Sequence, residues 1–172
     1  MSYHYVVTAH KPTNVTHAVV GNFTAPNDVN LIVCKSTRLE LHTLIDERLQ
    51  QVLDVPIFGR VATLQLWKPA GEKCELLFLT TERYQFCVLA FDPSTHELVT
   101  RANGDLHDRV GRPVEFGQIA IIDASCRLIG LRLYDGLLKL IPVGPAASGS
   151  ASATGSRVIS LGLYICEFIG FI

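Results

Sequence analysis

The sequence is poor in charged residues and lacks the short motifs that mark common catalytic folds. Only 18% of its 172 residues are charged and the formal net charge is −1, so no overall positive field is available to hold a nucleic-acid backbone. No phosphate-binding loop, dinucleotide fingerprint, Cys-x-x-Cys pair or His-Glu-x-x-His zinc motif is present. The sequence therefore disfavours direct DNA binding and predicts no catalytic residues, no cofactor and no enzymatic activity.

Closely paired cysteines are missing as well. The five cysteines are odd in number and well separated, and no charged-then-apolar leader of the secretory type precedes them. We therefore expect a reducing compartment. The cysteines are Cys34, Cys74, Cys87, Cys126 and Cys166.

The sequence is rich in hydrophobic residues, at 48%, and they recur in a hairpin pattern. Each repeat has an apolar run, a short polar turn and an alternating strand. From Arg38 to Arg83 the first two turns are 45 residues apart, a spacing typical of one four-stranded propeller blade. The step from Tyr84 to Leu138 is 54 residues, with the excess in a loop at 102–117. The repeats are Asn30–Leu44, Glu75–Phe91 and Ile129–Pro142.

The third repeat, IGLRLYDGLLKLIP, is the most regular hairpin and carries no reactive pair of side chains. Its turn residues, Asp135 and Gly136, tolerate a positive φ. Leucines alternate along both arms, so each arm has a leucine face. These leucines are Leu131 and Leu133 on the first arm, and Leu138 and Leu140 on the second.

We therefore predict an all-β fold: an incomplete β-propeller of about three four-stranded antiparallel blades. Further strands are expected at 3–9, 17–23, 51–57, 61–67, 96–101 and 118–122. A blade cannot bury both of its faces alone, so blades stack around a ring. Three blades are either an arc of a larger ring or need a partner to cover the open edge.

The composition changes after Pro142. Residues 143–157 are rich in Ala, Ser and Gly, which is typical of a flexible linker. Residues 158–172 form an apolar tail that is shorter than the roughly 18–20 residues of a membrane-spanning helix, and Glu167 disfavours insertion. We expect no membrane contact, and the tail is either a buried strand pair or a non-native end.

The densest polar cluster is RANGDLHDRVGRPVEFG, residues 101–117. Asp105, His107 and Asp108 are residue types that bind metals, but they lie within four residues of a loop with nothing nearby to orient them. A metal-dependent hydrolase is thus a remote alternative to a solvated loop, and no metal is predicted.

Arginines in the same loop suggest a second use for it. Neighbouring carboxylates neutralise the charge of these arginines, which disfavours a role in binding phosphate. At protein interfaces, by contrast, arginine side chains pair with carboxylates and stack on aromatic rings. Two interpretations stay open: a protein contact, or a loop braced from within by one arginine bonded to backbone carbonyls. The arginines are Arg101, Arg109 and Arg112.

Three stretches resemble one known family: MSYHYVVTAHKPT at the start, RVGRPVEFG (Arg109–Gly117) and IGLRLYDGLLKLIP (Ile129–Pro142). They are similar to the N-terminal part of the large subunit of damaged-DNA-binding protein, the triple-propeller adaptor of cullin-4 ubiquitin ligases. The similarity runs from residue 1 to about 142. Residues 1–142 are therefore expected to be the N-terminal part of a first propeller, followed by the linker and tail, where family members continue with a charged loop and another strand.

The resemblance implies a non-enzymatic scaffold of the nucleus and cytoplasm, acting in DNA damage recognition, repair and protein ubiquitination. In the family, the middle propeller docks the cullin and has no counterpart in these residues, while the first and third receive substrate receptors. Damaged DNA is expected to be contacted only indirectly, through a receptor. By similarity, the 109–117 loop would lie on the receptor-facing side, which makes Arg109, Arg112 and Glu115 the expected protein-interaction residues.

Two alternatives remain open. Wider kin of the family are propeller subunits of the splicing and polyadenylation machineries, so the chain is alternatively a nucleic-acid-associated propeller subunit. The second alternative is a truncated product without an independent function. An unclosed ring exposes strand edges and apolar faces, which favour aggregation of the chain on its own.

Overall fold

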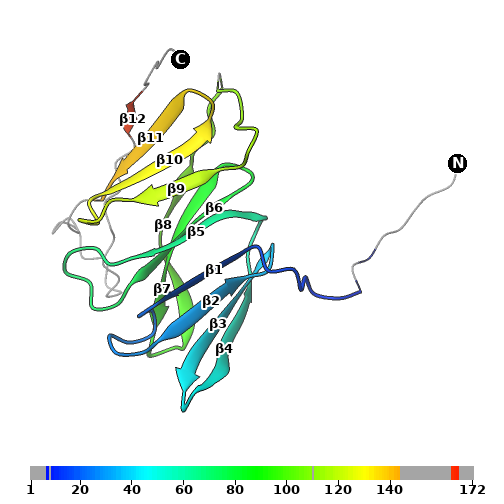
Figure 1. Ribbon diagram of the computed structural model, residues 1–172, viewed down its shortest axis with the longest axis vertical. Helices are drawn as coiled ribbons and strands as arrows, with labels where there is room; N and C mark the ends of the chain where they lie inside the picture. The colour runs from blue at the N-terminus through cyan, green and yellow to red at the C-terminus, as the bar shows by residue number, and fades with distance from the viewer. Residues whose placement is uncertain (1–6, 8, 110, 144–163, 167–172) are drawn as a thin grey trace, which may run out of the picture.

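The structure is a computed structural model that describes residues 7, 9–109, 111–143 and 164–166 (Figure 1). These residues form three four-stranded antiparallel sheets in which the strands follow one another in chain order, and no helix occurs among them. The predicted all-β fold, an incomplete β-propeller of three blades, is confirmed. Most of the predicted strand at 3–9, the linker and the tail lies outside the described residues.

Each sheet is one blade. The first contains β1 (His17–Gly21), β2 (Asn30–Cys34), β3 (Arg38–Ile45) and β4 (Arg48–Pro56). The second contains β5 (Val61–Trp67), β6 (Leu76–Thr81), β7 (Gln85–Asp92) and β8 (Glu97–Asp105). The third contains β9 (Ile119–Ile122), β10 (Leu128–Tyr134), β11 (Leu137–Pro142) and β12 (Tyr164–Cys166).

The blades stack through their first strands, because β5 contacts both β1 and β9 (Figure 1). The second blade is therefore covered on both faces, and every residue of its β6 is buried. Along this strand, Leu76 and Phe78 belong to the apolar cluster shared with the third blade, whereas Leu77 and Leu79 belong to the cluster shared with the first. The period-two alternation of a strand thus supplies two cores at once.

The third hairpin differs from its predicted form in its turn. Gly136 has a φ of 72°, but Asp135 is not among the residues with a positive φ, and a bulge lies between Arg132 and Tyr134. One left-handed residue next to a bulge closes a hairpin, so the second permissive residue is not needed.

The two arms of this hairpin bury different kinds of residue. Leu131 and Leu133 on β10 are fully buried. On β11 the side buried in the core carries Lys139 and Ile141, while Leu138 and Leu140 are partly exposed. The leucine face of the second arm is therefore the outer face of the blade.

The loop before the third blade is shorter than predicted. We expected it at 102–117, but β8 continues to Asp105 because β7 pairs with it as far as Gln85. After Pro142, residues 164–166 form β12, which pairs with β11 as the fourth strand of the third blade. In the described part of the chain, no helix has the length and hydropathy needed to cross a membrane.

Candidate protein-interaction surface

One end of the blade stack gathers the turns between second and third strands and the connections between blades. The connection at 57–60 is bonded to both blades that it joins: Ile57 N–H donates to Thr37 O at 2.7 Å, and Glu82 N–H donates to Arg60 O at 2.9 Å. These hydrogen bonds hold the connection and the neighbouring turns together as one surface.

The connection at 106–118 is fastened in the same way and carries the predicted site residues. Leu106 N–H donates to Tyr84 O at 2.6 Å, and Asp135 N–H donates to Arg112 O at 2.8 Å. Val114 N–H donates to Leu133 O at 3.3 Å. The backbone of the loop is therefore tied to the turns of the second and third blades.

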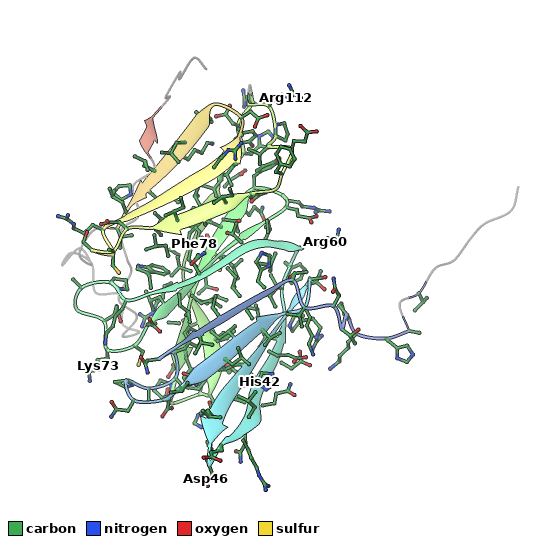
Figure 2. All side chains as sticks on the ribbon, viewed as in Figure 1. His42, Asp46, Arg60, Lys73, Phe78 and Arg112 are labelled. Carbon is green, nitrogen blue, oxygen red and sulfur yellow. The ribbon has the colours of Figure 1, made fainter. Side chains whose placement is uncertain are left out.

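Several charged side chains of the loop, by contrast, are exposed to solvent. Arg109, Arg112 and Glu115 are all exposed, and Phe116 is 87% exposed. Figure 2 shows Arg112 beside the turn of the third blade, at the end opposite Asp46. The structure thus places the three predicted residues, all of them exposed, in a connection whose backbone is bonded to the blades at Leu106, Arg112 and Val114.

Tyr134 supports this loop from below. Its hydroxyl accepts a hydrogen bond from Asp108 N–H at 2.8 Å, and burial raises the pKa of the phenol, which keeps it neutral. A Cβ atom on Gly111 would lie 2.6 Å from the Tyr134 ring, so only glycine permits this approach. The loop therefore lies directly on the tyrosine.

A second tyrosine completes the support. The rings of Tyr84 and Tyr134 stack with centroids 4.9 Å apart and an interplanar angle of 19°. Tyr84 has a φ of 59°, which is unusual for a bulky residue and costs on the order of 1 kcal/mol. Stacking and the bond from Leu106 offset this strain.

The residues weighed for metal binding have other partners. The Asp105 carboxylate accepts from His107 N–H at 2.8 Å, and the Asp108 carboxylate accepts from Gly111 N–H at 3.3 Å. The His107 ring meets Tyr84 edge-on. Within the described ranges, no group of three His, Cys, Asp or Glu residues is placed to hold a metal ion.

The loop is also braced from the third blade, by a residue that the sequence interpretation missed. Lys139 on β11 donates from Nζ to Leu106 O at 2.7 Å, and the predicted bracing by an arginine stays a prediction. The available signal was a lysine at an alternating position of the most regular hairpin, next to Leu138 and Leu140. Arg101 lies in β8, outside the loop.

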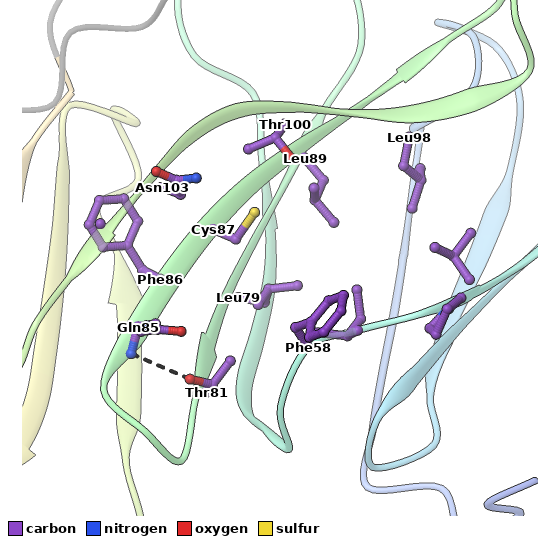
Figure 3. Close-up of a pocket in the computed structure, with 14 residues that line it drawn as sticks. Phe58, Leu79, Thr81, Gln85, Phe86, Cys87, Leu89, Leu98, Thr100 and Asn103 are labelled. Carbon is purple, nitrogen blue, oxygen red and sulfur yellow. Dashed lines mark hydrogen bonds between the residues drawn. The ribbon is translucent and has the colours of Figure 1, made fainter.

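A pocket of about 560 Å³ lies between the first and second blades (Figure 3). Its walls are mainly apolar and include Leu79, Leu98 and Phe58, whose side chain is fully exposed. Burial raises the pKa of the Cys87 thiol in the same wall. Among the described lining residues there is no His, Lys, Arg, Asp or Glu, so they supply no acid–base pair.

Comparisons with known proteins agree with this architecture. Residues 14–163 match the model of the RSE1/DDB1/CPSF1 first beta-propeller. The chain is 63% identical over 141 residues to DNA damage-binding protein 1a of Arabidopsis thaliana and 62% identical over 140 residues to DNA damage-binding protein 1 of Solanum lycopersicum. These alignments cover 82% and 81% of this chain, and 13% of the length of each relative. The blade topology and the matched range together show that the chain belongs to the RSE1/DDB1/CPSF1 first beta-propeller family.

Proposed function

We propose that this chain is part of a non-enzymatic protein-interaction scaffold that serves DNA damage recognition and repair. The observation that carries the proposal is its identity of about 60% with proteins named DNA damage-binding protein 1 over about 140 residues. The scaffold acts as an adaptor of cullin-4 ubiquitin ligases, in the nucleus and also in the cytoplasm, and thereby serves protein ubiquitination.

The contact with substrate receptors is made by the loop at 106–118. Arg109 and Arg112 supply guanidinium forks that pair with carboxylates or stack on aromatic rings, and Glu115 supplies an acceptor for basic groups. All three side chains are exposed while the loop backbone is bonded to the blades below. Damaged DNA is reached only through a receptor, because a net charge of −1 provides little attraction for phosphates.

The proposal is tested by transplanting the segment into a complete relative. Residues 1–142 of this chain replace the matching segment of the Arabidopsis thaliana protein, and the chimera is purified with cullin-4 and a tryptophan-aspartate-repeat receptor. We expect the chimera to retain both partners. A chimera that melts like the unmodified relative but retains neither would contradict the proposal.

The contact residues are tested in the same chimera. Reversing the charges with Arg109→Glu and Arg112→Glu is expected to weaken receptor binding by about tenfold or more, since truncating interface hot spots costs about 2 kcal/mol or more. Arg48→Glu is the matched control, because Arg48 is exposed at the opposite end of the first blade. If both variants bind the receptor equally well, the loop is not part of the interface.

A nucleic-acid-associated propeller subunit is the second candidate, since the matching family model covers RSE1 and CPSF1 as well as DDB1. It predicts that the isolated chain binds RNA or damaged DNA with an affinity that falls steeply as salt rises, because phosphate contacts release counterions. Binding that is absent at low salt excludes this candidate.

A further inference from the structure

Lys139 is a lysine in the core of the third blade. It lies on β11 beside Ile141, and only 2% of its surface is exposed. A buried ammonium group is stable only where charged or hydrogen-bonding partners replace the lost water. The groups that contact the Lys139 ammonium therefore show which part of the molecule it stabilises.

All of these partners lie at or under the start of the 106–118 loop. The Nζ atom donates to Leu106 O at 2.7 Å and lies 3.6 Å from the Asp108 carboxylate. It also lies 5.5 Å from the centroid of the Tyr134 ring, within the range of a cation–π contact. The side chain thus reaches from β11 to the first residues after β8, 33 positions earlier in the sequence.

These contacts set the direction in which the loop leaves the blade. Leu106 is completely buried, and Asp108 is held on one side by Lys139 and on the other by its N–H bond to the Tyr134 hydroxyl. Arg109 follows immediately and is exposed. Arg109, one of the three proposed contact residues, therefore comes directly after the residue that Lys139 and Tyr134 hold.

We propose that Lys139 is a positioning residue that holds the 106–118 loop in the conformation in which Arg109, Arg112 and Glu115 meet a partner. A loop that is already ordered loses less conformational freedom on binding, which increases affinity without any contact from the lysine itself. The identity of the partner, a substrate receptor, rests on the proposed function. The order of the loop does not, and it is measured separately.

The test replaces Lys139 with Met in the full 172-residue chain. Methionine keeps the apolar stem and removes only the charge and its hydrogen bond. Hydrogen exchange of the amides of Leu106, Asp108 and Val114 is expected to accelerate by roughly tenfold to a hundredfold, the equivalent of one lost hydrogen bond to a charged group. The amides of β9 and β10 are expected to exchange as before.

Two further variants make the result decisive. Lys73→Met is the matched control, because Lys73 is exposed in the connection between β5 and β6 (Figure 2), and it should leave loop exchange unchanged. Asp108→Asn removes the charge that faces Lys139 at a partly exposed position, and it should also accelerate exchange within the loop. If Lys139→Met does not fold, Asp108→Asn decides the matter, and unchanged loop exchange in that variant overturns the proposal.

Receptor binding is measured in parallel with the Arabidopsis thaliana chimera that carries Lys139→Met. We expect the affinity to fall by about tenfold, with an intact fold by circular dichroism. A loosened loop with unchanged affinity would overturn the positioning role. If the unsubstituted chimera retains no receptor, the proposed function fails, while loop exchange still decides whether Lys139 orders the loop.

Discussion

Substitutions at two adjacent residues of β6 can show whether the two interfaces between blades are stabilised independently of each other. Phe78 and Leu79 are 0% and 1% exposed, but they face opposite blades. Phe78 packs edge-on against Trp67 at 6.2 Å and stacks with Phe86 at 6.0 Å. Replacing a buried Phe by Ala costs about 3–5 kcal/mol, and two aromatic contacts place a residue in the upper part of this range. We therefore expect Phe78→Ala to destabilise the chain by about 4–5 kcal/mol.

Leu79→Ala is the matched variant, with an expected loss of about 2–4 kcal/mol for a buried leucine. Both losses are measurable by urea unfolding, because a domain of this size is stabilised by only about 5–15 kcal/mol. The two variants are expected to differ in which blades lose stability. In a stacked-blade fold each blade contacts only its neighbours, so energetic effects stay near the altered interface.

Native-state hydrogen exchange measures that location. Phe78→Ala should accelerate the exchange of β10 and leave β2 and β3 nearly unchanged, whereas Leu79→Ala should do the reverse. Equal acceleration of all three blades by both variants would refute the division into two separate apolar clusters. It would mean that the three sheets unfold as one cooperative unit.

Three further predictions follow from other contacts. Asn30→Ala should destabilise the chain by about 2–4 kcal/mol in urea unfolding, because the side-chain oxygen Oδ1 of the buried Asn30 accepts hydrogen bonds from the backbone N–H groups of Phe23 and Thr24, both at 2.8 Å. Gly111→Ala should displace the loop from Tyr134, cost about 1–3 kcal/mol and be detected as faster exchange of the loop amides. The bond from Arg38 lowers the pKa of Asp54, so its stabilisation is present above the unfolded value of about 3.9 and is lost as the pH falls through the lower folded value. Arg38→Met should therefore make acid unfolding below about pH 4 less steep in a fluorescence titration.

Local signals in the sequence predict most of the fold. The strand at 61–67 has the predicted bounds, because its apolar residues mark its course and Pro69 marks its end. The hairpin at 129–142 is also where it was expected. By contrast, the end of β8 depends on how far β7 continues, since the strands pair from Asp92 with Glu97 to Gln85 with Asp105. Pairing between strands is not visible in the alternation of either strand alone.

Lys139 shows a different limit of prediction. Its position in an alternating strand is a local fact, but its partners are the carbonyl of Leu106 and the carboxylate of Asp108, more than 30 residues earlier. Only the folded structure brings them together. The same applies to the loop itself, where exposure of Arg109 and Arg112 was predictable from composition, while the bonds that fix its backbone were not.

The position of the loop in the blade stack links the fold to the proposed contact. Both blades that the 106–118 loop joins lie within the described chain, and their shared apolar cluster includes Leu106 and Tyr134. The outer face of the third blade is less complete, since Ile121 on β9 is exposed. In a propeller that face is covered by a further blade, and the relatives are much longer than this chain. The loop contacts described above come from the second and third blades. We therefore expect its exchange rates in the 172-residue chain and in the chimera to agree, and a large difference between them would show that further blades help to order it.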